Sequence, residues 1–259
     1  MIYKLNLKEY PDFKEFMRQN CGIASLEWTH FIDEEMEKVE IYVSNKPPRG
    51  FMLLHRDVNV FIRTDSEKML GNFLKILNKE KGYAFRCPEW TSSLIMKTFK
   101  PQKEGYVGVI LLTYYTDTKM FKRYVNPNYA VKPLSEDSAR EIMEHTRRPF
   151  TIEFIQDRIR RGYFYGIYDN QELISHTGTL WESNEACEIG FAYTKEKHRG
   201  RGLAKTLTSI VTDKTLEEGK IPLLHTVKTN IPAIKACEAL GYRIGARELG
   251  YFYTPKLQA

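Results

Sequence analysis

Apolar and polar positions along the chain follow two periods, and together they predict helices and strands mixed throughout the sequence. The apolar residues of 66–77 recur with the spacing of an amphipathic helix, whereas short apolar runs such as 58–62 are bounded by turn-forming residues, as strands are. In residues 1–117 the pattern predicts strands at 2–5, 39–43, 51–54, 58–62, 83–87 and 106–115, and helices at 10–17, 66–77 and 89–99. In residues 129–259 it predicts strands at 130–134, 163–168, 173–180, 187–194, 222–227 and 243–253, and helices at 135–145, 150–161, 203–218 and 233–240.

These elements fall into two sets, separated by the polar and basic residues 118–128, which include Pro127. The predicted organisation is therefore a domain at 1–117, a linker at 118–128 and a second domain at 129–259. Strands 163–168, 173–180 and 187–194 follow one another with short turns, so we expect them to be antiparallel. The predicted fold class is α/β of the α+β type.

The stretch from Glu188 to Ala204 combines a strand, a short basic loop and the start of a helix. Gly200 and Gly202 let the backbone approach a ligand closely, because they carry no side chain. The helix that starts at Leu203 offers unpaired N–H groups and the positive end of its dipole. This arrangement favours binding of an anion such as a pyrophosphate.

Two motifs specify this anion site further. Arg199, Gly202 and Ala204 have the spacing R-x-x-G-x-A, while the P-loop pattern and the G-x-G-x-x-G dinucleotide pattern are not found. A second motif, residues 230–242, reads NIPAIKACEALGY. The two motifs and the order of elements around them resemble the GNAT (general N-acetyltransferase) superfamily over residues 129–254. Within this superfamily, the run HRGRGLAKTL followed by N-x-x-A is most similar to the glycine N-acyltransferase-like branch. Members of that branch have two GNAT-like halves.

The resemblance implies a tandem GNAT-like fold, with mixed, mostly antiparallel sheets flanked by helices and a degenerate N-terminal half that binds no CoA of its own. It also implies acetyl-CoA or CoA as co-substrate. The implied cofactor-binding residues are the strand residues Ala192, Tyr193 and Thr194, the loop residues Arg199, Gly200, Arg201, Gly202, Leu203 and Ala204, and Asn230. Ordinary pairing remains the alternative for the strand residues, and helix capping remains one for Asn230.

Glu188 is the candidate general base, since its place before the loop is close to that of the strand glutamate in several GNAT enzymes. A solvated, outward-facing glutamate is the alternative. Cys237 occupies the position where the resembling motif carries a tyrosine, and we expect it to be mainly a packing residue. His176 could be a base or a substrate ligand, but a hydrogen-bonded structural histidine is the simpler interpretation.

Composition and charge narrow the class of protein. The chain has 259 residues, of which 42% are hydrophobic and 28% charged, as is typical of a globular protein. No apolar run is long enough to span a membrane and no signal peptide is recognisable, so we expect a cytoplasmic protein. Four widely spaced cysteines suggest neither disulfides nor a metal site. The net charge of +6 suits CoA, and it also suits nucleic acid, although no nucleic-acid-binding motif is found.

The sequence therefore predicts an acyl-CoA-dependent N-acyltransferase, in which a primary amine of a small molecule or a peptide attacks acetyl-CoA directly in a ternary complex. A GNAT-fold module that binds CoA as a sensor or scaffold without turnover is the alternative. The acceptor amine, the acyl chain length and the oligomeric state stay open.

Overall fold

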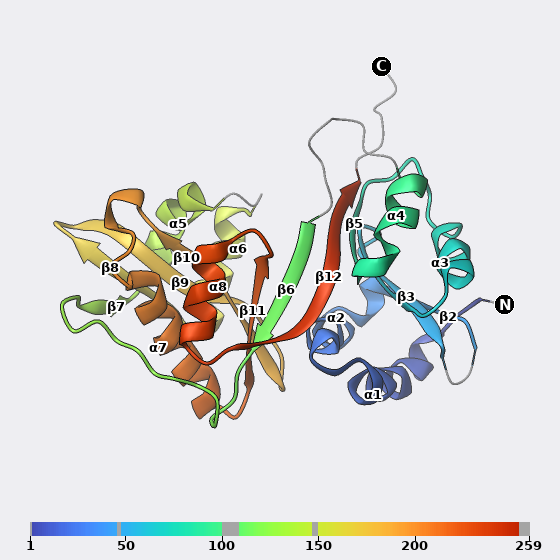
Figure 1. Cartoon of the computed structure of the whole chain (residues 1–259), viewed down its shortest axis with the longest axis horizontal. Coiled ribbons are helices and arrows are strands. Elements are labelled where there is room, and N and C mark those ends of the chain that lie inside the picture. Colours follow the sequence, from blue (N-terminus) through green and yellow to red (C-terminus); the bar gives the residue numbers. More distant parts are fainter. Residues whose placement is uncertain (1, 46–47, 100–108, 147–149, 254–259) are drawn as a thin grey trace, which may run out of the picture. The chain divides into compact units, whose positions relative to one another are not determined.

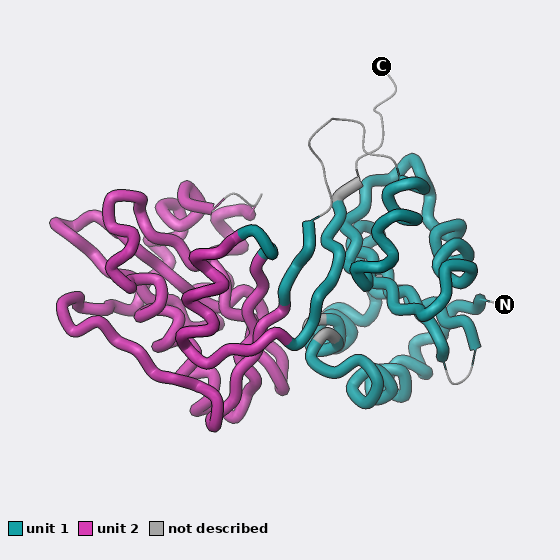
Figure 2. The backbone as a smooth tube through the Cα atoms, in the orientation of Figure 1, with its two compact units in different colours: residues 1–112, 227–229, 245–259 teal, residues 113–226, 230–244 magenta. Residues whose placement is uncertain are grey.

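The structure is a computed structural model and describes residues 2–45, 48–99, 109–146 and 150–253. The chain forms two compact units, coloured separately in Figure 2. Unit 1 comprises residues 1–112, 227–229 and 245–259, and unit 2 comprises residues 113–226 and 230–244. The predicted domain division at 118–128 remains a prediction. The two compact units have other boundaries, because residues 245–259 near the C-terminus belong to unit 1.

Unit 1 contains a sheet in which one strand comes from the far end of the sequence. Its strands lie in the order β1 (Tyr3–Lys4), β2 (Val39–Val43), β3 (Gly50–His55), β4 (Asn59–Thr64), β5 (Tyr83–Pro88) and β12 (Arg243–Tyr253). Neighbouring strands are antiparallel except β4 and β5, which are parallel. Residues 248–253 of β12 pair with the whole of β5.

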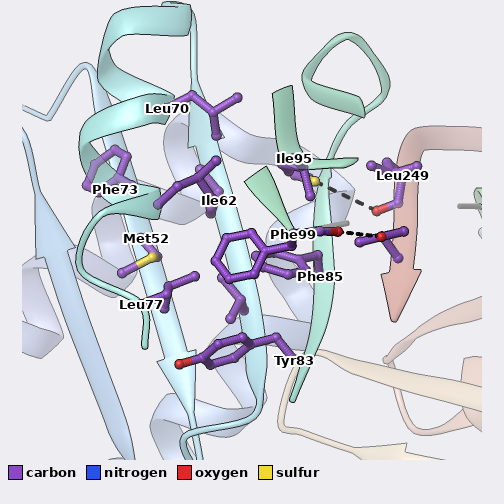
Figure 3. Packing of buried hydrophobic residues seen from close by; sticks show 14 of the residues in the cluster. Met52, Ile62, Leu70, Phe73, Leu77, Tyr83, Phe85, Ile95, Phe99 and Leu249 are labelled. Atoms are coloured by element: carbon purple, nitrogen blue, oxygen red, sulfur yellow. Dashed lines mark hydrogen bonds between the residues drawn. The ribbon is translucent and has the colours of Figure 1, made fainter. Parts of the chain in front are cut away.

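Helices cover both faces of this sheet, because successive residues of each strand point to opposite faces. Phe61 of β4 packs in a cluster with α1 (Tyr10–Cys21) and α2 (Leu26–Glu34). Its neighbour Ile62 packs in a second cluster with α3 (Glu67–Leu74) and α4 (Ser92–Thr98), shown in Figure 3. Tyr251 of β12 closes the second cluster and donates a hydrogen bond to the carbonyl of Phe99 at 2.6 Å.

A buried charge pair joins β12 to β5. Glu248 has no exposed surface, and the Nη2 atom of Arg86 lies 2.7 Å from its Oε2 atom. Arg63 of β4 is the second cation, with its Nη2 atom 3.8 Å from Oε1. Removing one member of such a pair typically costs about 3–5 kcal/mol, because a charge stays buried without its counterion.

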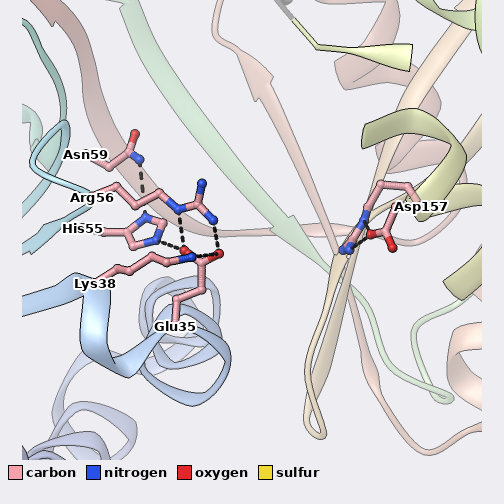
Figure 4. Close-up of polar contacts among 7 residues, drawn as sticks. Glu35, Lys38, His55, Arg56, Asn59 and Asp157 are labelled. Carbon is pink, nitrogen blue, oxygen red and sulfur yellow. Dashed lines mark hydrogen bonds and ion pairs between the residues drawn. The ribbon is translucent and has the colours of Figure 1, made fainter. Parts of the chain in front are cut away.

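Polar contacts hold the β3–β4 hairpin to the end of α2 (Figure 4). The Glu35 carboxylate lies 2.5 Å from Nε2 of His55 and accepts two hydrogen bonds from the guanidinium of Arg56. Asn59 contacts the other nitrogen of His55 at 3.4 Å. The hydrogen bonds from Arg56 outweigh the burial of Glu35 and lower the pKa of its carboxyl from 4.5 to about 2.

We expect this lowered pKa to make stability depend on pH. Because the folded state prefers the charged carboxylate, the contribution of Glu35 is complete above pH 4.5 and is lost as the pH falls toward 2. Urea unfolding of the wild type and Glu35→Gln should differ by about 3 kcal/mol at pH 7, and the difference should shrink between pH 5 and pH 3. Glu37→Gln, which changes an exposed carboxylate nearby, is the control. A difference that stays constant down to pH 3 would contradict the assignment.

Unit 2 repeats the plan of unit 1 (Figure 1). Its strands lie in the order β11 (Ile221–Val227), β10 (Ala186–Thr194), β9 (Glu172–Glu182), β8 (Phe164–Asp169) and β7 (Val131–Pro133). All neighbouring pairs are antiparallel except β10 and β11, which are parallel. The antiparallel prediction for the three middle strands is thus confirmed. In both units one strand, two helices and three strands precede a helix, a parallel strand and a last helix.

Two pairs of helices complete unit 2. Helices α5 (Ala139–His145) and α6 (Ile152–Arg161) share a cluster with Phe164 and Leu173 of the sheet. Helix α7 (Leu203–Glu217) packs through Leu203 and Leu207 on Ile167 and Ile174. Helix α8 (Ile231–Ala239) follows β11, and β6 (Val109–Tyr115) divides between the two units after Leu112.

The sequence pattern missed α2 entirely. Its sequence LEWTHFIDE is rich in aromatic and β-branched residues, which have low helix propensity, yet Trp28 and Ile32 bury a continuous face. The predicted strand 106–115 is observed from Val109 onward, and residues 106–108 lie outside the described part of the chain.

Candidate functional site

Strand β10 leaves its neighbour β11 halfway along its length. The parallel pairing runs from Ala186 opposite Ile221 to Ile189 opposite Leu224, whereas β10 continues to Thr194. On its other side β10 stays paired with β9, with a register shift between Gly190 and Tyr193. Among the described residues, Tyr193 and Thr194 therefore have ladder partners only on the β9 side, and Ala192 lies within the register shift.

A bulge at Phe191 marks this departure. Its φ of 53° is uncommon for a residue with a side chain and costs roughly 1–2 kcal/mol. The Phe191 ring is held between Phe150 and Phe164, with ring centroids 5.3 and 5.2 Å away. Packing thus stabilises a backbone conformation that interrupts the regular ladder, as bulges beside functional sites do.

The glycine loop follows the free edge directly. Gly200 and Gly202 have φ values of 77° and 76°, and Gly202 stands at the N-cap of α7 without a side-chain cap. The first-turn N–H groups of this 15-residue helix therefore have no partner within the helix. The geometry is that of an anion site at a helix start.

The two arginines of the loop also have structural contacts. Arg199 donates from Nε to the carbonyl of Thr194 at 3.1 Å, which ties the loop to the end of β10, and its side chain is 60% exposed. Arg201 donates to the carbonyl of Lys197 at 3.4 Å. Neither contact uses the whole guanidinium, so both side chains keep donors for an anion.

Residues 117–128, here named the connecting segment, contact α7. The N–H of Tyr124 donates to Oγ of Ser209 at 2.9 Å, and that of Asn126 donates to Oγ1 of Thr206 at 3.0 Å. A Cβ atom built on Gly202 would lie 2.7 Å from the Tyr124 hydroxyl oxygen, and the Lys205 ammonium lies 3.6 Å from the Tyr124 ring centroid. The connecting segment therefore backs the glycine loop, and a side chain at position 202 would have to adopt a strained φ of 76° and displace Tyr124.

Glu188 does not face solvent. It is 4% exposed in β10, and its carboxylate accepts a hydrogen bond from the indole N–H of Trp181. Its Oε1 atom lies 3.0 Å from Nδ1 of His225 on β11. The outward, solvated alternative is therefore wrong, and the carboxylate lies near the point where β10 and β11 separate.

His225 is a site residue that sequence reasoning missed. It interrupts the strand IPLLHTV and is 7% exposed in its side chain. The sequence does show a lone histidine in an apolar strand. It becomes a candidate site residue only through its contact with Glu188 in the adjacent strand, which the sequence does not reveal.

Helix α8 carries the remaining predicted residues. Asn230 caps it by accepting a hydrogen bond from the N–H of Ala233 at 3.4 Å, so the capping interpretation holds. Cys237 is 7% exposed, and burial raises the pKa of its thiol to about 12. His198 lies in the turn before the loop and is buried, with its Nδ1 atom 4.0 Å from Oδ2 of Asp169.

Neither a metal cluster nor a membrane helix is found in residues 2–45, 48–99, 109–146 and 150–253. No group of three His, Cys, Asp or Glu side chains there could hold a metal ion. No helix among these residues has the length and hydrophobicity to span a membrane.

Part of unit 2, with most of β12, matches a known family model. Residues 164–249 match the model described as FR47-like protein, and these residues include β10, the glycine loop and α8. No curated protein matches the sequence significantly.

Solved structures match over nearly the whole chain. A Drosophila protein has a TM-score of 0.73 at 14% identity, covering 96% of this chain and 98% of its own. A GCN5-related N-acetyltransferase from Sphaerobacter thermophilus has a TM-score of 0.67 at 13% identity, covering 100% and 97%. A tandem GNAT protein from the clavulanic acid biosynthesis pathway has a TM-score of 0.60 at 10% identity, covering 97% of each chain. The chain thus has a tandem GNAT fold, as the resemblance of its motifs implied, and residues 164–249 match the FR47-like family model.

Proposed function

We propose that this chain is an acyl-CoA-dependent N-acyltransferase that transfers an acetyl group from acetyl-CoA to a primary amine in a ternary complex. The supporting observation is that the free edge of β10 leads directly into an uncapped helix start. A pantetheine arm carries amide groups that can pair with such an edge, and a pyrophosphate suits the helix start next to it. One continuous surface then suits both parts of CoA.

In this proposal Ala192, Tyr193 and Thr194 bind the pantetheine and Arg199 to Ala204 bind the pyrophosphate. Backbone N–H groups at the bulge polarise the thioester carbonyl as the amine attacks it. Glu188, with His225, accepts a proton from the attacking nitrogen. The acceptor amine belongs to a small molecule or a peptide.

Unit 1 has the corresponding strand and helix without the anion site. The chain passes from Thr64 of β4 to α3 without a glycine, and the side chain of Ser66 accepts a hydrogen bond from the N–H of Met69 at 3.4 Å. The first turn of α3 is thus capped by its own chain. We therefore expect one CoA per chain, bound by unit 2.

A CoA-binding sensor or scaffold without turnover is the second candidate. Cys237 favours it, because a buried thiol whose pKa is about 12 stands where the resembling motif has a tyrosine. The Glu188–His225 contact favours the enzyme, because a buried carboxylate beside an imidazole is costly unless it has a task.

If Cys237 only packs, Cys237→Ala should lower kcat less than tenfold. The CoA thiolate is a stable leaving group, so it needs no acid from this thiol. Steady-state kinetics with thiol detection would measure the effect, and Cys187→Ala, which truncates another buried cysteine, controls for lost packing. A hundredfold loss of kcat in Cys237→Ala, with unchanged CoA affinity, would show that the thiol takes part in catalysis.

The proposal is tested by incubating the protein with acetyl-CoA, longer acyl-CoAs and a panel of primary amines while thiol release is followed. We expect release that depends on an amine, and calorimetry should give one CoA per chain. CoA binding without any amine-dependent release would support the sensor instead. Two CoA per chain would contradict the assignment of unit 1.

A further inference from the structure

Two histidines and a tyrosine form a stack beside the bulge of β10. His176 of β9 lies directly opposite Tyr193 of β10 in the ladder. His145, the last residue of α5, stacks on Tyr193 with ring centroids 4.2 Å apart and on His176 at 5.3 Å. Tyr193 is one of the residues proposed to bind pantetheine, so the stack borders the proposed site.

The two imidazoles contact each other through one nitrogen of each ring, and the tautomers decide which nitrogen donates. Nδ1 of His145 lies 3.2 Å from Nε2 of His176. The Nδ1 atom of His176 is buried and has no regular hydrogen bond among the described residues. The backbone of Phe191 raises the pKa of this ring, and we therefore place the proton of His176 on Nδ1. With that proton on Nδ1, Nε2 of His176 accepts from Nδ1–H of His145. The Nε2 atom of His145 then carries a lone pair.

Both rings are neutral at pH 7, and they differ in exposure. Burial, assisted by His145, lowers the pKa of His176 to about 3, and the ring is 1% exposed. Burial also lowers the pKa of His145, as does Lys195, whereas the carboxylates Glu141, Glu144 and Glu172 raise it. His145 is only half-buried, so it can exchange a proton with solvent.

We propose that His145 is a catalytic base that removes the ammonium proton of the acceptor amine, and that His176 is the positioning residue that fixes its tautomer. This inference rests on the proposed N-acyltransferase function. A protonated amine must lose one proton before it attacks the thioester and a second one afterwards. Glu188 and His225 are almost fully buried, so they suit the second transfer, which takes place away from solvent.

The proposed reaction has three proton-transfer and bond-breaking steps: deprotonation of the ammonium, attack on the thioester and release of CoA. Nε2 of His145 takes a proton from R–NH₃⁺, and the N–H electron pair remains on the nitrogen as the nucleophile. The amine attacks the thioester carbon, its second proton passes through Glu188 to the CoA sulfur, and the C–S bond breaks. The products are the amide and CoA thiol, and the imidazolium of His145 releases its proton to water.

The test compares His145→Gln, His145→Ala and His176→Gln with His30→Gln, which changes a half-buried histidine of unit 1. We expect His145→Gln to lower kcat/KM for the amine about 10²-fold while KM for acetyl-CoA changes little. The rise of kcat/KM with pH below 6.5 should disappear, because the base must be neutral to act. Imidazole in the buffer should partly restore His145→Ala, and His176→Gln should shift the pH profile.

Other results would overturn the inference. One such result is a His145→Gln enzyme whose kcat/KM has the wild-type pH profile. The other is a His145→Ala enzyme that binds CoA more weakly and whose lost activity imidazole does not restore. Wild-type protein that binds CoA but releases no thiol with any amine overturns the proposed function, and this inference with it. Amine-dependent release that survives loss of His145 overturns the inference alone.

Discussion

Gly202→Glu should abolish CoA binding while the protein stays folded. A side chain at this position must adopt a φ of 76° and displace Tyr124, whose hydroxyl oxygen lies 2.7 Å from the place of the new Cβ. The left-handed conformation alone costs roughly 1–2 kcal/mol, and the added carboxylate repels a pyrophosphate at the helix start. Calorimetry should show CoA affinity reduced at least about 100-fold, which corresponds to about 2.7 kcal/mol.

Two other glycines provide matched controls. Gly200 and Gly219 have φ values of 77° and 74°, and a Cβ on either meets nothing within 4 Å. Gly219→Ala, at the far end of α7, should leave CoA affinity unchanged, and Gly200→Ala should weaken it less than Gly202→Glu does. Equal CoA affinity in the wild type and Gly202→Glu would refute the placement of CoA on this loop.

Glu188→Gln should lower kcat about 100-fold or more, because the amide cannot accept a proton. The substitution keeps the side-chain shape, and its carbonyl oxygen can still accept from the indole N–H of Trp181. The KM for acetyl-CoA and the thermal unfolding temperature should therefore change little. Steady-state kinetics and calorimetry measure these quantities.

Glu182→Gln serves as the control for charge removal nearby. Glu182 lies on β9 and forms an ion pair with Lys220. Its loss should leave kcat unchanged. If Glu188→Gln keeps more than a tenth of the wild-type kcat, another group accepts the proton assigned to Glu188.

The glycine loop could be predicted from sequence because its chemistry is local. Two glycines between a strand and a helix are visible as spacing, and in the structure both have a positive φ. Short apolar runs bounded by turn-forming residues likewise predicted the strands of unit 2.

The remaining parts of the site depend on contacts between distant residues. The bulge at Phe191 is held by Phe150 and Phe164, and nothing in the strand itself requires it. His225 gains its role from Glu188 in the neighbouring strand.

The polar and basic composition of the connecting segment predicts a linker, but composition says nothing of its contacts with α7. These contacts use the buried hydroxyls of Thr206 and Ser209. A helix of a soluble domain seldom buries hydroxyl groups without a partner.

The pairing of β12 with β5 has a consequence for how the protein is synthesised. Arg86 and Glu248 are separated by 162 positions in sequence, so the ribosome must translate almost the whole chain before the sheet of unit 1 is complete. Until then β5 exposes an unpaired edge, and Arg86 lacks its buried counterion. A nascent or truncated chain that ends near residue 112 therefore presents an edge prone to aggregation.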